Sequence, residues 1–398
     1  MGDKGISRRG LIAAGAFGVA GGAALGVGGT ALALDAERPD SGPEVGTATV
    51  PFYGEHQAGV ETPPPAHGLF FALDLKKGTD ADRFARIMRL LTDDAARLTQ
   101  GRAPLADTEP ELAELPSNLT VTFGFGPSLF AKLGREDAMP ENFAGLPAYE
   151  SIDRLEDRWS GGDLLVQVCA DDLMAVAHAQ RMLLKDSRSF LGVRWVQRGF
   201  RNSAGVVEPE KTQRNVMGQL DGSANPRPGS EEFRETVWAG GSGPFAGGTT
   251  LALRRIRVDL ETWDKLDVGS KEVHVGRRLA DGAPLTGGKE SDDPDLEAKE
   301  NGLEVISPNA HVRRSTAPDG RKIYRRAYNY DDGPTSEGTS ETGLLFASYQ
   351  ADLEQFTVIQ ERLAESDLLN NYTTPVGSAV FAIPPGCEEG GWAGETLF

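Results

Sequence analysis

The spacing of apolar residues between positions 67 and 200 allows few folds. Apolar residues recur at helical spacing in 80–98 and 172–184. Strand-like runs, either continuously apolar or alternating with polar residues, occur at 69–75, 119–125, 163–170 and 192–200. The order strand, helix, strand, strand, helix, strand is that of a ferredoxin-like unit, in which an antiparallel sheet carries its helices on one face.

The second half of the chain repeats this order in architecture, without an obvious repeat in sequence. We expect helices that begin at 260 and cover 353–364, and strands at 249–258, 322–330, 343–349 and 378–383. Residues 277–305 are polar and rich in Gly and Asp, which indicates a long loop near a functional site. The predicted class is therefore α+β, with two ferredoxin-like modules, each an antiparallel sheet with helices on one face, as in a dimeric α+β barrel.

The chain divides into four predicted segments. Residues 1–34 have the features of a signal peptide, and residues 35–66, rich in Pro, Gly and Ala, indicate an extended arm that is not packed. The two ferredoxin-like domains then cover 67–210 and 211–398.

The first segment resembles a twin-arginine signal. Lys4 and Arg8-Arg9 precede a weakly hydrophobic stretch that ends in a small-residue cleavage site at 31–33. A transmembrane anchor is the less favoured alternative, because Gly and Ala bury little apolar area. We therefore expect the twin-arginine translocase as a partner, no stable membrane anchor, and a location outside the cell, at its surface or in the periplasm.

Charge and cysteine content exclude several functions. The formal net charge of -18 argues against a nucleic-acid partner, because binding to phosphates needs a basic surface. The two cysteines, Cys169 and Cys387, form no Cys-x-x-Cys pair, so neither a zinc or iron–sulfur motif nor a covalent haem attachment site is present.

A carboxylate between two glycines marks the candidate site. Asp221 lies between Gly218 and Gly222, which permit a tight turn that would present the side chain from a rigid loop. A surface Asx-turn is the alternative for such an Asp-Gly pair. About 90 residues later come His311 and Arg325, a candidate metal ligand and a candidate cation in two short stretches.

Together these stretches resemble the dye-decolourising peroxidases, whose signature is the Gly-x-x-Asp-Gly loop found here at 218–222. Further blocks occur in the family's order at 51–59, 247–258 with Trp263-Asp264, 343–350 and 376–382. The first block is most similar to the exported subgroup that includes deferrochelatase-type proteins. The resemblance implies two ferredoxin-like modules and a haem b (iron protoporphyrin IX) held non-covalently, mainly by the second.

The resemblance also implies which residues would face the iron. It makes His311 the proximal ligand, with Asp367 as the acid that accepts its second N–H, as is usual for bound imidazoles. From the residues alone, Glu365, Asp352 or a merely structural acid at a helix end stay open in place of Asp367. The other histidines that stay open as ligands are His56, His67, His178 and His274.

On the open side of the haem, the resemblance implies Asp221 as the acid–base catalyst and Arg325 as the cation beside the breaking O–O bond. Because an unperturbed carboxylate has a pKa of about 4, we expect activity to be highest at acidic pH. Arg326 is expected to point to the other side of its strand.

Three further residues are candidates for the haem pocket. Phe346 and Leu253 are predicted as apolar walls, although residues of this kind are as often sheet core. Arg277 is predicted to pair with a haem propionate, with a surface salt bridge as the alternative. Aromatic residues that could carry electrons from bulky donors, but that are more often core, are Trp238, Trp263, Tyr324, Tyr328, Tyr330 and Tyr349.

The predicted function is a haem peroxidase that reduces hydrogen peroxide and, through a ferryl intermediate, oxidises aromatic dyes, phenols or other small or bulky organic donors. The alternatives are release of iron from haem, as in a deferrochelatase, and non-catalytic haem binding or delivery. Asp221 and Arg325 argue against mere binding, because neither is needed to hold a porphyrin. The residues leave the assembly state open, a homo-oligomer included.

Overall fold

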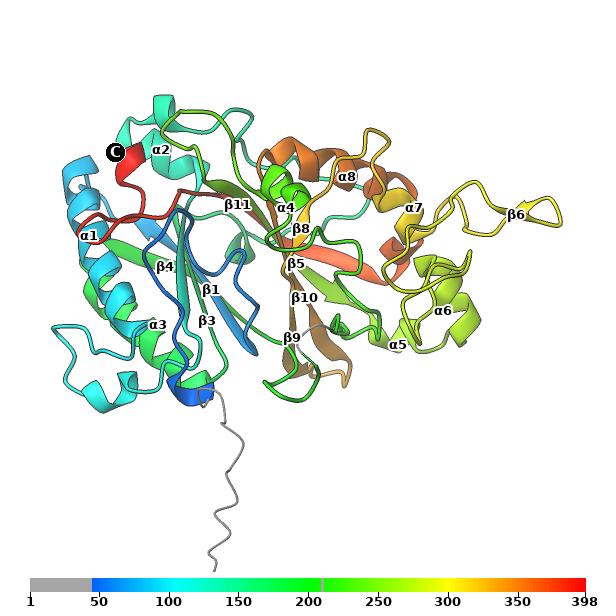
Figure 1. Ribbon diagram of the computed structural model, residues 1–398, viewed down its shortest axis with the longest axis horizontal. Coiled ribbons are helices and arrows are strands. Elements are labelled where there is room, and N and C mark those ends of the chain that lie inside the picture. Colours follow the sequence, from blue (N-terminus) through cyan, green and yellow to red (C-terminus); the bar gives the residue numbers. More distant parts are fainter. Residues whose placement is uncertain (1–44, 209–210) are drawn as a thin grey trace, which may run out of the picture. The chain divides into compact units, whose positions relative to one another are not determined.

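The computed structural model describes residues 45–208 and 211–398. One continuous nine-stranded antiparallel sheet carries their fold, and it consists of an N-terminal and a C-terminal four-stranded sheet and one further short strand. The N-terminal sheet contains β1 (His67–Leu75), β2 (Thr120–Phe125), β3 (Leu164–Ala170) and β4 (Leu191–Phe200), in the spatial order β2-β3-β1-β4. Helices α1 (Ala81–Leu98) and α3 (Leu173–Ser187) pack against each other beside this sheet (Figure 1). This order is the predicted ferredoxin-like one.

The C-terminal sheet repeats the arrangement. Helix α8 (Leu353–Ser366) packs on β5 and β10. The prediction of one strand at 322–330 is wrong, because the chain forms a short strand β8 (Tyr324–Arg325) on β10 and then starts again at Tyr328. The four long strands of this sheet lie in the order β9-β10-β5-β11 and are β5 (Thr249–Val258), β9 (Tyr328–Pro334), β10 (Ser340–Gln350) and β11 (Thr373–Ile383).

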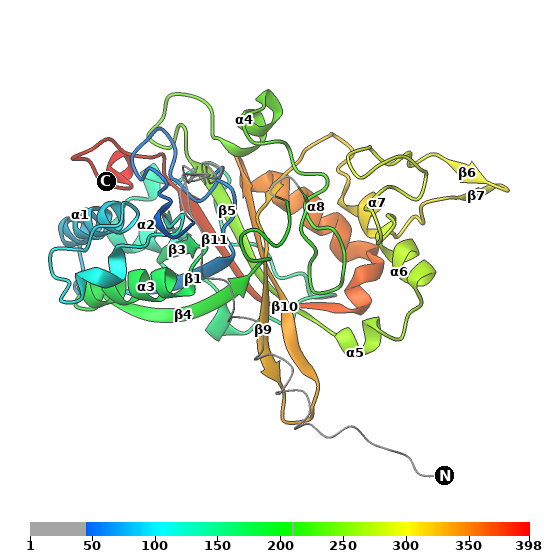
Figure 2. The ribbon, with the colours of Figure 1, turned by 60° about the horizontal axis from the view of Figure 1, so that its bottom comes forward.

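The two sheets close on each other. Ala382 of β11 pairs with Phe125 of β2, and Phe200 of β4 pairs with Asn329 of β9. An apolar cluster from both sheets fills the space between them, and a second cluster lies between the outer sheet faces and the helices. The turned view in Figure 2 shows α1 and α3 beside the N-terminal strands and α7 and α8 beside the C-terminal ones. The predicted α+β class with two ferredoxin-like modules is confirmed.

The segment before β1 differs from the prediction. Residues 50–66 contain no helix or strand, as expected of an arm, but they are packed against the sheets. Val60 is fully buried, and the side chain of Gln57 is bonded to backbone atoms on both sides of the β2–β11 junction. The expectation of an unpacked arm is therefore wrong for these residues. The predicted signal peptide, 1–34, and residues 35–44 lie outside the described part of the chain.

The remaining α-helices and strands of the described residues are short. Apart from one small hairpin, residues 277–305 form the predicted loop. In the described part of the chain, no helix is both long and apolar enough to cross a membrane. These short elements are α2 (Pro127–Leu133), α4 (Glu231–Val237), α5 (Leu260–Trp263), α6 (Val268–Val275), α7 (His311–Ser315), β6 (Lys299–Glu300) and β7 (Leu303–Glu304).

Candidate active site

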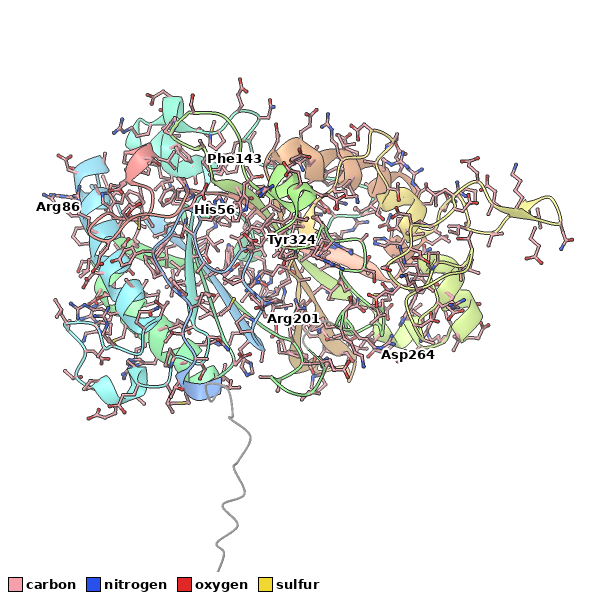
Figure 3. All side chains as sticks on the ribbon, viewed as in Figure 1. His56, Arg86, Phe143, Arg201, Asp264 and Tyr324 are labelled. Atoms are coloured by element: carbon pink, nitrogen blue, oxygen red, sulfur yellow. The ribbon has the colours of Figure 1, made fainter. Side chains whose placement is uncertain are left out.

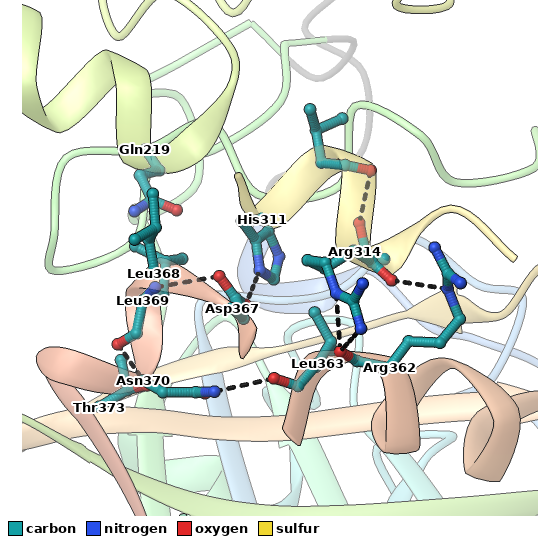
Figure 4. A network of polar contacts seen from close by, with 12 residues as sticks. Gln219, His311, Arg314, Arg362, Leu363, Asp367, Leu368, Leu369, Asn370 and Thr373 are labelled. Atoms are coloured by element: carbon teal, nitrogen blue, oxygen red, sulfur yellow. Dashed lines mark hydrogen bonds and ion pairs between the residues drawn. The ribbon is translucent and has the colours of Figure 1, made fainter. Parts of the chain in front are cut away.

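His311 is the first residue of α7, and its ring is held by a buried carboxylate. Its Nδ1 donates a hydrogen bond of 2.6 Å to Oδ2 of Asp367, at the end of α8 (Figure 4). The other oxygen of Asp367 accepts the backbone N–H of Leu369 at 2.9 Å, so the carboxylate itself is fixed. No hydrogen bond to Nε2 of His311 is found among the described residues, and the side chain is 27% exposed. This nitrogen is free to bind a metal.

Two arginines join the helix of His311 to α8. The guanidinium of Arg314 donates to the carbonyl of Arg362 at 2.9 and 2.7 Å, and that of Arg362 donates to the carbonyls of Arg314 and Arg313 at 3.2 and 3.3 Å. The bonds from Arg362 satisfy carbonyls of the short helix α7 that have no partner within that helix. Figure 4 shows both arginines beside the bond between His311 and Asp367. These contacts could not be predicted from the residue types, because each arginine bonds to backbone carbonyls.

The geometry separates Asp367 from the alternative acids. Glu365 forms an ion pair with Arg314, and Asp352 accepts the backbone N–H of Glu354 as the N-cap of α8. Asp367 is therefore the one among the three considered acids that contacts His311.

The other histidines are engaged elsewhere. His178 also bonds to a carboxylate, that of Asp107, at 2.9 Å, but both side chains are almost completely buried. His56 bonds to the carbonyl of Gly247, and His274 to that of Ser270 within α6. His67 is the first residue of β1. His56 also has a bonded Nδ1 and a side chain that is 23% exposed, but its Nδ1 partner is a carbonyl and its Nε2 lies 4.0 Å from Glu55. Among the described residues, none of these four histidines bonds Nδ1 to a carboxylate as His311 does.

Asp221 and Arg325 lie next to each other. Nη1 of Arg325 is 3.4 Å from Oδ1 of Asp221, and the two side chains are 23% and 11% exposed. Gly218 and Gly222 have φ values of +81° and +124°, as expected for the tight turn that presents Asp221. Arg214 stabilises the turn by donating to the carbonyl of Gly218 at 2.7 Å. The predicted carboxylate and cation are thus brought together.

A second guanidinium acts on Asp221. Arg201, just after β4, donates to the carbonyl of Ala327 at 3.1 Å and lies over the ring of Tyr328. Figure 3 labels Arg201 and Tyr324 in the middle of the view. Burial lowers the pKa of Arg201, and the charge of Asp221 is among the charges that oppose this effect. Sequence reasoning missed Arg201, because it belongs to the N-terminal module.

Arg277 links the helix that begins with His311 to the charged pair of Asp221 and Arg325. It follows α6, whose C-terminal Gly276 packs against Val312 of α7 so closely that an added Cβ would lie 2.3 Å from that side chain. The guanidinium of Arg277 donates to the carbonyls of Gly282 and Glu290 at 2.9 Å. Burial lowers the pKa of Arg277, and the positive charge of Arg325 adds to this effect. The surface salt bridge considered as an alternative is not formed with any described residue.

Only one of the two residues predicted as apolar walls of the haem pocket, Phe346 and Leu253, can line that pocket. In the β10–β5 register Phe346 lies opposite Arg254, and Leu253 lies opposite Ala347, so Phe346 and Leu253 point to opposite faces of the sheet. Leu253 belongs to the cluster between the two sheets, whereas Phe346 is half-buried on the face that carries α8. Leu253 is therefore sheet core and cannot share a pocket with Phe346.

Arg326 points into the space between the sheets, as predicted. It is 1% exposed and donates to the carbonyl of Thr62 in the arm. Burial raises the pKa of Tyr328 and Tyr349 nearby. Tyr324, Tyr328, Tyr330 and Tyr349 all belong to the same buried cluster, which agrees with a role in the core.

The donor set fits an iron porphyrin. A single fixed imidazole is sufficient as a protein ligand, because the porphyrin provides four nitrogens. Phe346 offers an apolar contact on the α8 face, and Arg277 offers a positive charge suited to a propionate. Asp221 and Arg325 add a carboxylate and a guanidinium 3.4 Å apart, neither of which is needed to hold a porphyrin.

Comparisons with known proteins agree with this reading. Residues 212–388 match the family model described as "Dyp-type peroxidase, C-terminal", and residues 57–201 match "Dyp-type peroxidase, N-terminal". The chain is 39% identical over 359 residues to a dye-decolorizing peroxidase of Thermobifida fusca, covering 86% of this chain and 83% of that protein.

Two further relatives are similar over most of the chain. A deferrochelatase of Escherichia coli K12 is 34% identical over 369 residues, covering 87% of this chain and 86% of that protein. The crystal structure of a DyP-type peroxidase from Cellulomonas bogoriensis superposes with a TM-score of 0.86 at 46% identity, covering 89% of this chain and 99% of that one.

Proposed function

The chain belongs to the DyP-type peroxidase family of haem enzymes, and we propose that it reduces hydrogen peroxide and oxidises organic donors such as aromatic dyes and phenols. The observation that carries the proposal is the contact of 3.4 Å between Arg325 and Asp221. Holding a porphyrin needs neither residue, whereas cleaving a peroxide needs both a base and a cation.

We propose a non-covalent haem b as the cofactor, and Nε2 of His311 would bind its iron. Asp367 holds the imidazole in the tautomer that leaves Nε2 unprotonated and increases its donor strength. Arg277 would bind a propionate and Phe346 would contact the macrocycle. When bound, haem supplies the iron and the two electrons needed to cleave the O–O bond of the peroxide.

Asp221 and Arg325 carry the proton and charge steps. The carboxylate of Asp221 accepts the proton from the inner oxygen of the peroxide and returns it to the outer oxygen, which leaves as water. The guanidinium of Arg325 stabilises the negative charge that develops on the departing oxygen. Arg201 adds a further positive charge, which interacts with the charge of Asp221.

The test is the reaction of the haem-loaded mature protein with one equivalent of hydrogen peroxide near pH 5. We expect a fast shift of the Soret band that an aromatic donor reverses. Asp221→Ala and Arg325→Ala should each slow the shift by about 10²- to 10³-fold, because each removes one group that acts in the transition state. The haem content and the resting spectrum should stay unchanged, since His311 is not altered.

A wild-type protein whose spectrum does not respond to peroxide would overturn the proposal. Equal rates in the wild type and in both variants would show that the protein is a peroxidase that does not use Asp221 and Arg325 as proposed.

Release of iron from haem is the second candidate, favoured by the similarity to the deferrochelatase of Escherichia coli. It would leave intact protoporphyrin, which fluoresces once the iron is lost. Incubation of the haem-loaded protein under reducing conditions with a ferrous chelator distinguishes the two, because a peroxidase alone should give no such fluorescence.

We also propose that residues 1–34 direct export by the twin-arginine route. In the sequence, we place the boundary between the two modules after residue 210. Replacing Arg8 and Arg9 by Lys should retain the protein and its haem inside the cell, as measured by fractionation. Export at the wild-type level would contradict the proposed route.

A further inference from the structure

Strand β8 leaves the backbone of Arg325 without a neighbour on one side. β8 pairs with β10 through Arg325 opposite Ser348 and Tyr324 opposite Tyr349, and it is the last strand in the sheet order. The N–H of Arg326 bonds to the carbonyl of Ala347 in β10 at 2.9 Å. Because successive N–H groups of a strand point in opposite directions, the N–H and C=O of Arg325 point away from β10.

Asn225 takes the place of the missing strand. Its Oδ1 accepts the N–H of Arg325 at 3.0 Å, and its Nδ2 donates to the C=O of the same residue at 2.7 Å. This is the pattern of bonds that a neighbouring strand would make. A primary amide is suited to it, because it holds a donor and an acceptor side by side, whereas a carboxylate can only accept.

Asn225 also connects the turn that presents Asp221 to the strand of Arg325. Asn225 is four residues after Asp221, in the same glycine-containing turn, and its own N–H bonds to the carbonyl of Gly222 at 2.8 Å. The turn is thus tied to the backbone of Arg325 at one point and to its guanidinium, through Asp221, at another. Two attachments fix the orientation of two groups, whereas the single ion pair of 3.4 Å between Arg325 and Asp221 would not.

We propose that Asn225 is a positioning residue that sets the guanidinium of Arg325 against Asp221 for the reaction with peroxide. The inference rests on the proposed roles of Asp221 and Arg325, and it adds a residue that touches neither peroxide nor haem. Misplacing a catalytic group by about 1 Å can cost about 10²-fold in rate, so the loss of the amide should be visible in kinetics.

The experiment measures the second-order rate constant for hydrogen peroxide in the haem-loaded protein with Asn225→Ala and Asn225→Asp. The second variant keeps the size of the side chain and its acceptor but loses the donor, which guards against poor folding of the first. We expect both to react about 10- to 100-fold more slowly, with an unchanged haem content and an unchanged KM for the organic donor. A general loosening of the fold would alter those two quantities.

A double-mutant cycle shows whether Asn225 acts through Arg325. In the Arg325→Ala background, Asn225→Ala should have little further effect, because the group that it positions is gone. Ser223→Ala is the matched control, since it removes one hydrogen bond of 2.9 Å, to Glu290, from the same turn. It should react with peroxide within about twofold of the wild type.

Wild-type rates in both Asn225 variants, with Arg325→Ala impaired, would overturn the inference and leave the proposed function standing. Equal additional losses in the wild-type and Arg325→Ala backgrounds would also overturn it. A wild-type rate in Arg325→Ala would overturn the proposed mechanism and this inference with it.

Discussion

At the scale of single residues, the site depends on pairs in which one side chain fixes the other. His311 was identified through its resemblance to a family motif, and its bond to Asp367 agrees with the partner that the same resemblance implied. Residues alone could not decide between Asp367, Glu365 and Asp352, because all three acids flank the same helix. Only the fold shows that two of them are engaged with Arg314 and with the N-terminus of α8.

Replacing Asp367 by Asn tests this pair. The neutral amide cannot provide the negative charge that strengthens the imidazole as a ligand, so haem should bind about 10- to 100-fold more weakly. The reduction potential of the bound iron should rise, because a weaker donor stabilises the ferric state less. Haem titration and spectroelectrochemistry measure the two effects.

Glu365→Gln is the control for that substitution, since Glu365 is an exposed acid two residues away that bonds to Arg314 and not to His311. It should keep the haem affinity and the potential of the wild type. The same affinity and potential in Asp367→Asn would show that the carboxylate does not act on the ligand.

The incorrect prediction at this scale has a geometric reason. Leu253 and Phe346 both lie in apolar strand runs, and an apolar run does not say which face of the sheet a residue occupies. The register of β10 and β5 decides it, and that register is set by contacts across the two strands.

At the scale of elements, α1 carries a buried acid on the face that packs against α3. Asp94 is 2% exposed, and one of its carboxylate oxygens has no partner among the described residues. Burial, followed by the hydrogen bond and the charge of Asp186, raises the pKa of Asp94 to about 8. The folded protein therefore keeps a proton on Asp94 at neutral pH, whereas the unfolded chain, with a pKa near 4, releases it.

This difference makes stability depend on pH. A group whose pKa is raised on folding contributes fully below about pH 4, and its contribution is lost as pH rises towards 8. Asp94→Asn removes the titration, so the free energy of unfolding of the variant relative to the wild type should rise with pH, by about 1–2 kcal/mol at pH 5 and by about 5 kcal/mol at pH 8, at about 1.4 kcal/mol per pKa unit. Urea unfolding of the haem-loaded protein at the two pH values measures the change.

Asp93→Asn is the matched control, because Asp93 is next in the same helix but pairs with Arg97 near the surface. It should change the stability by less than about 1 kcal/mol at either pH. A constant difference between Asp94→Asn and the wild type from pH 5 to 8 would show that Asp94 is ionised in the folded protein.

The sequence allowed most elements to be predicted, because their apolar residues recur with clear periods, as in 80–98 and 249–258. The prediction was wrong between Arg325 and Tyr328, where the strand predicted at 322–330 is interrupted. There Arg326 turns inwards to bond with the arm, and Arg325 is turned outwards to Asp221. Such a break is set by tertiary contacts, which local periodicity does not contain.

At the scale of the whole described unit, two sheets are joined by little direct pairing. The junction of β2 and β11 has the single pair Phe125 and Ala382. Gln57 of the arm completes it, since its Nε2 donates to the carbonyls of Phe123 and Pro384 at 3.0 Å, and its Oε1 accepts the N–H of Phe123 at 2.8 Å. The side-chain amide of Gln57 therefore joins backbone segments here, as that of Asn225 does at β8. The composition of the arm could not show that it has this role.

Replacing Gln57 by Ala should destabilise the protein by about 2–4 kcal/mol, because it leaves buried backbone groups at the junction without partners. Gln100→Ala is the control, since Gln100 contacts the same arm through a bond of 2.8 Å to the carbonyl of Val50 at a half-buried position. Its loss should cost about 1 kcal/mol or less. Chemical unfolding measures both. Equal losses in the two variants would show that the arm covers the sheets without joining them.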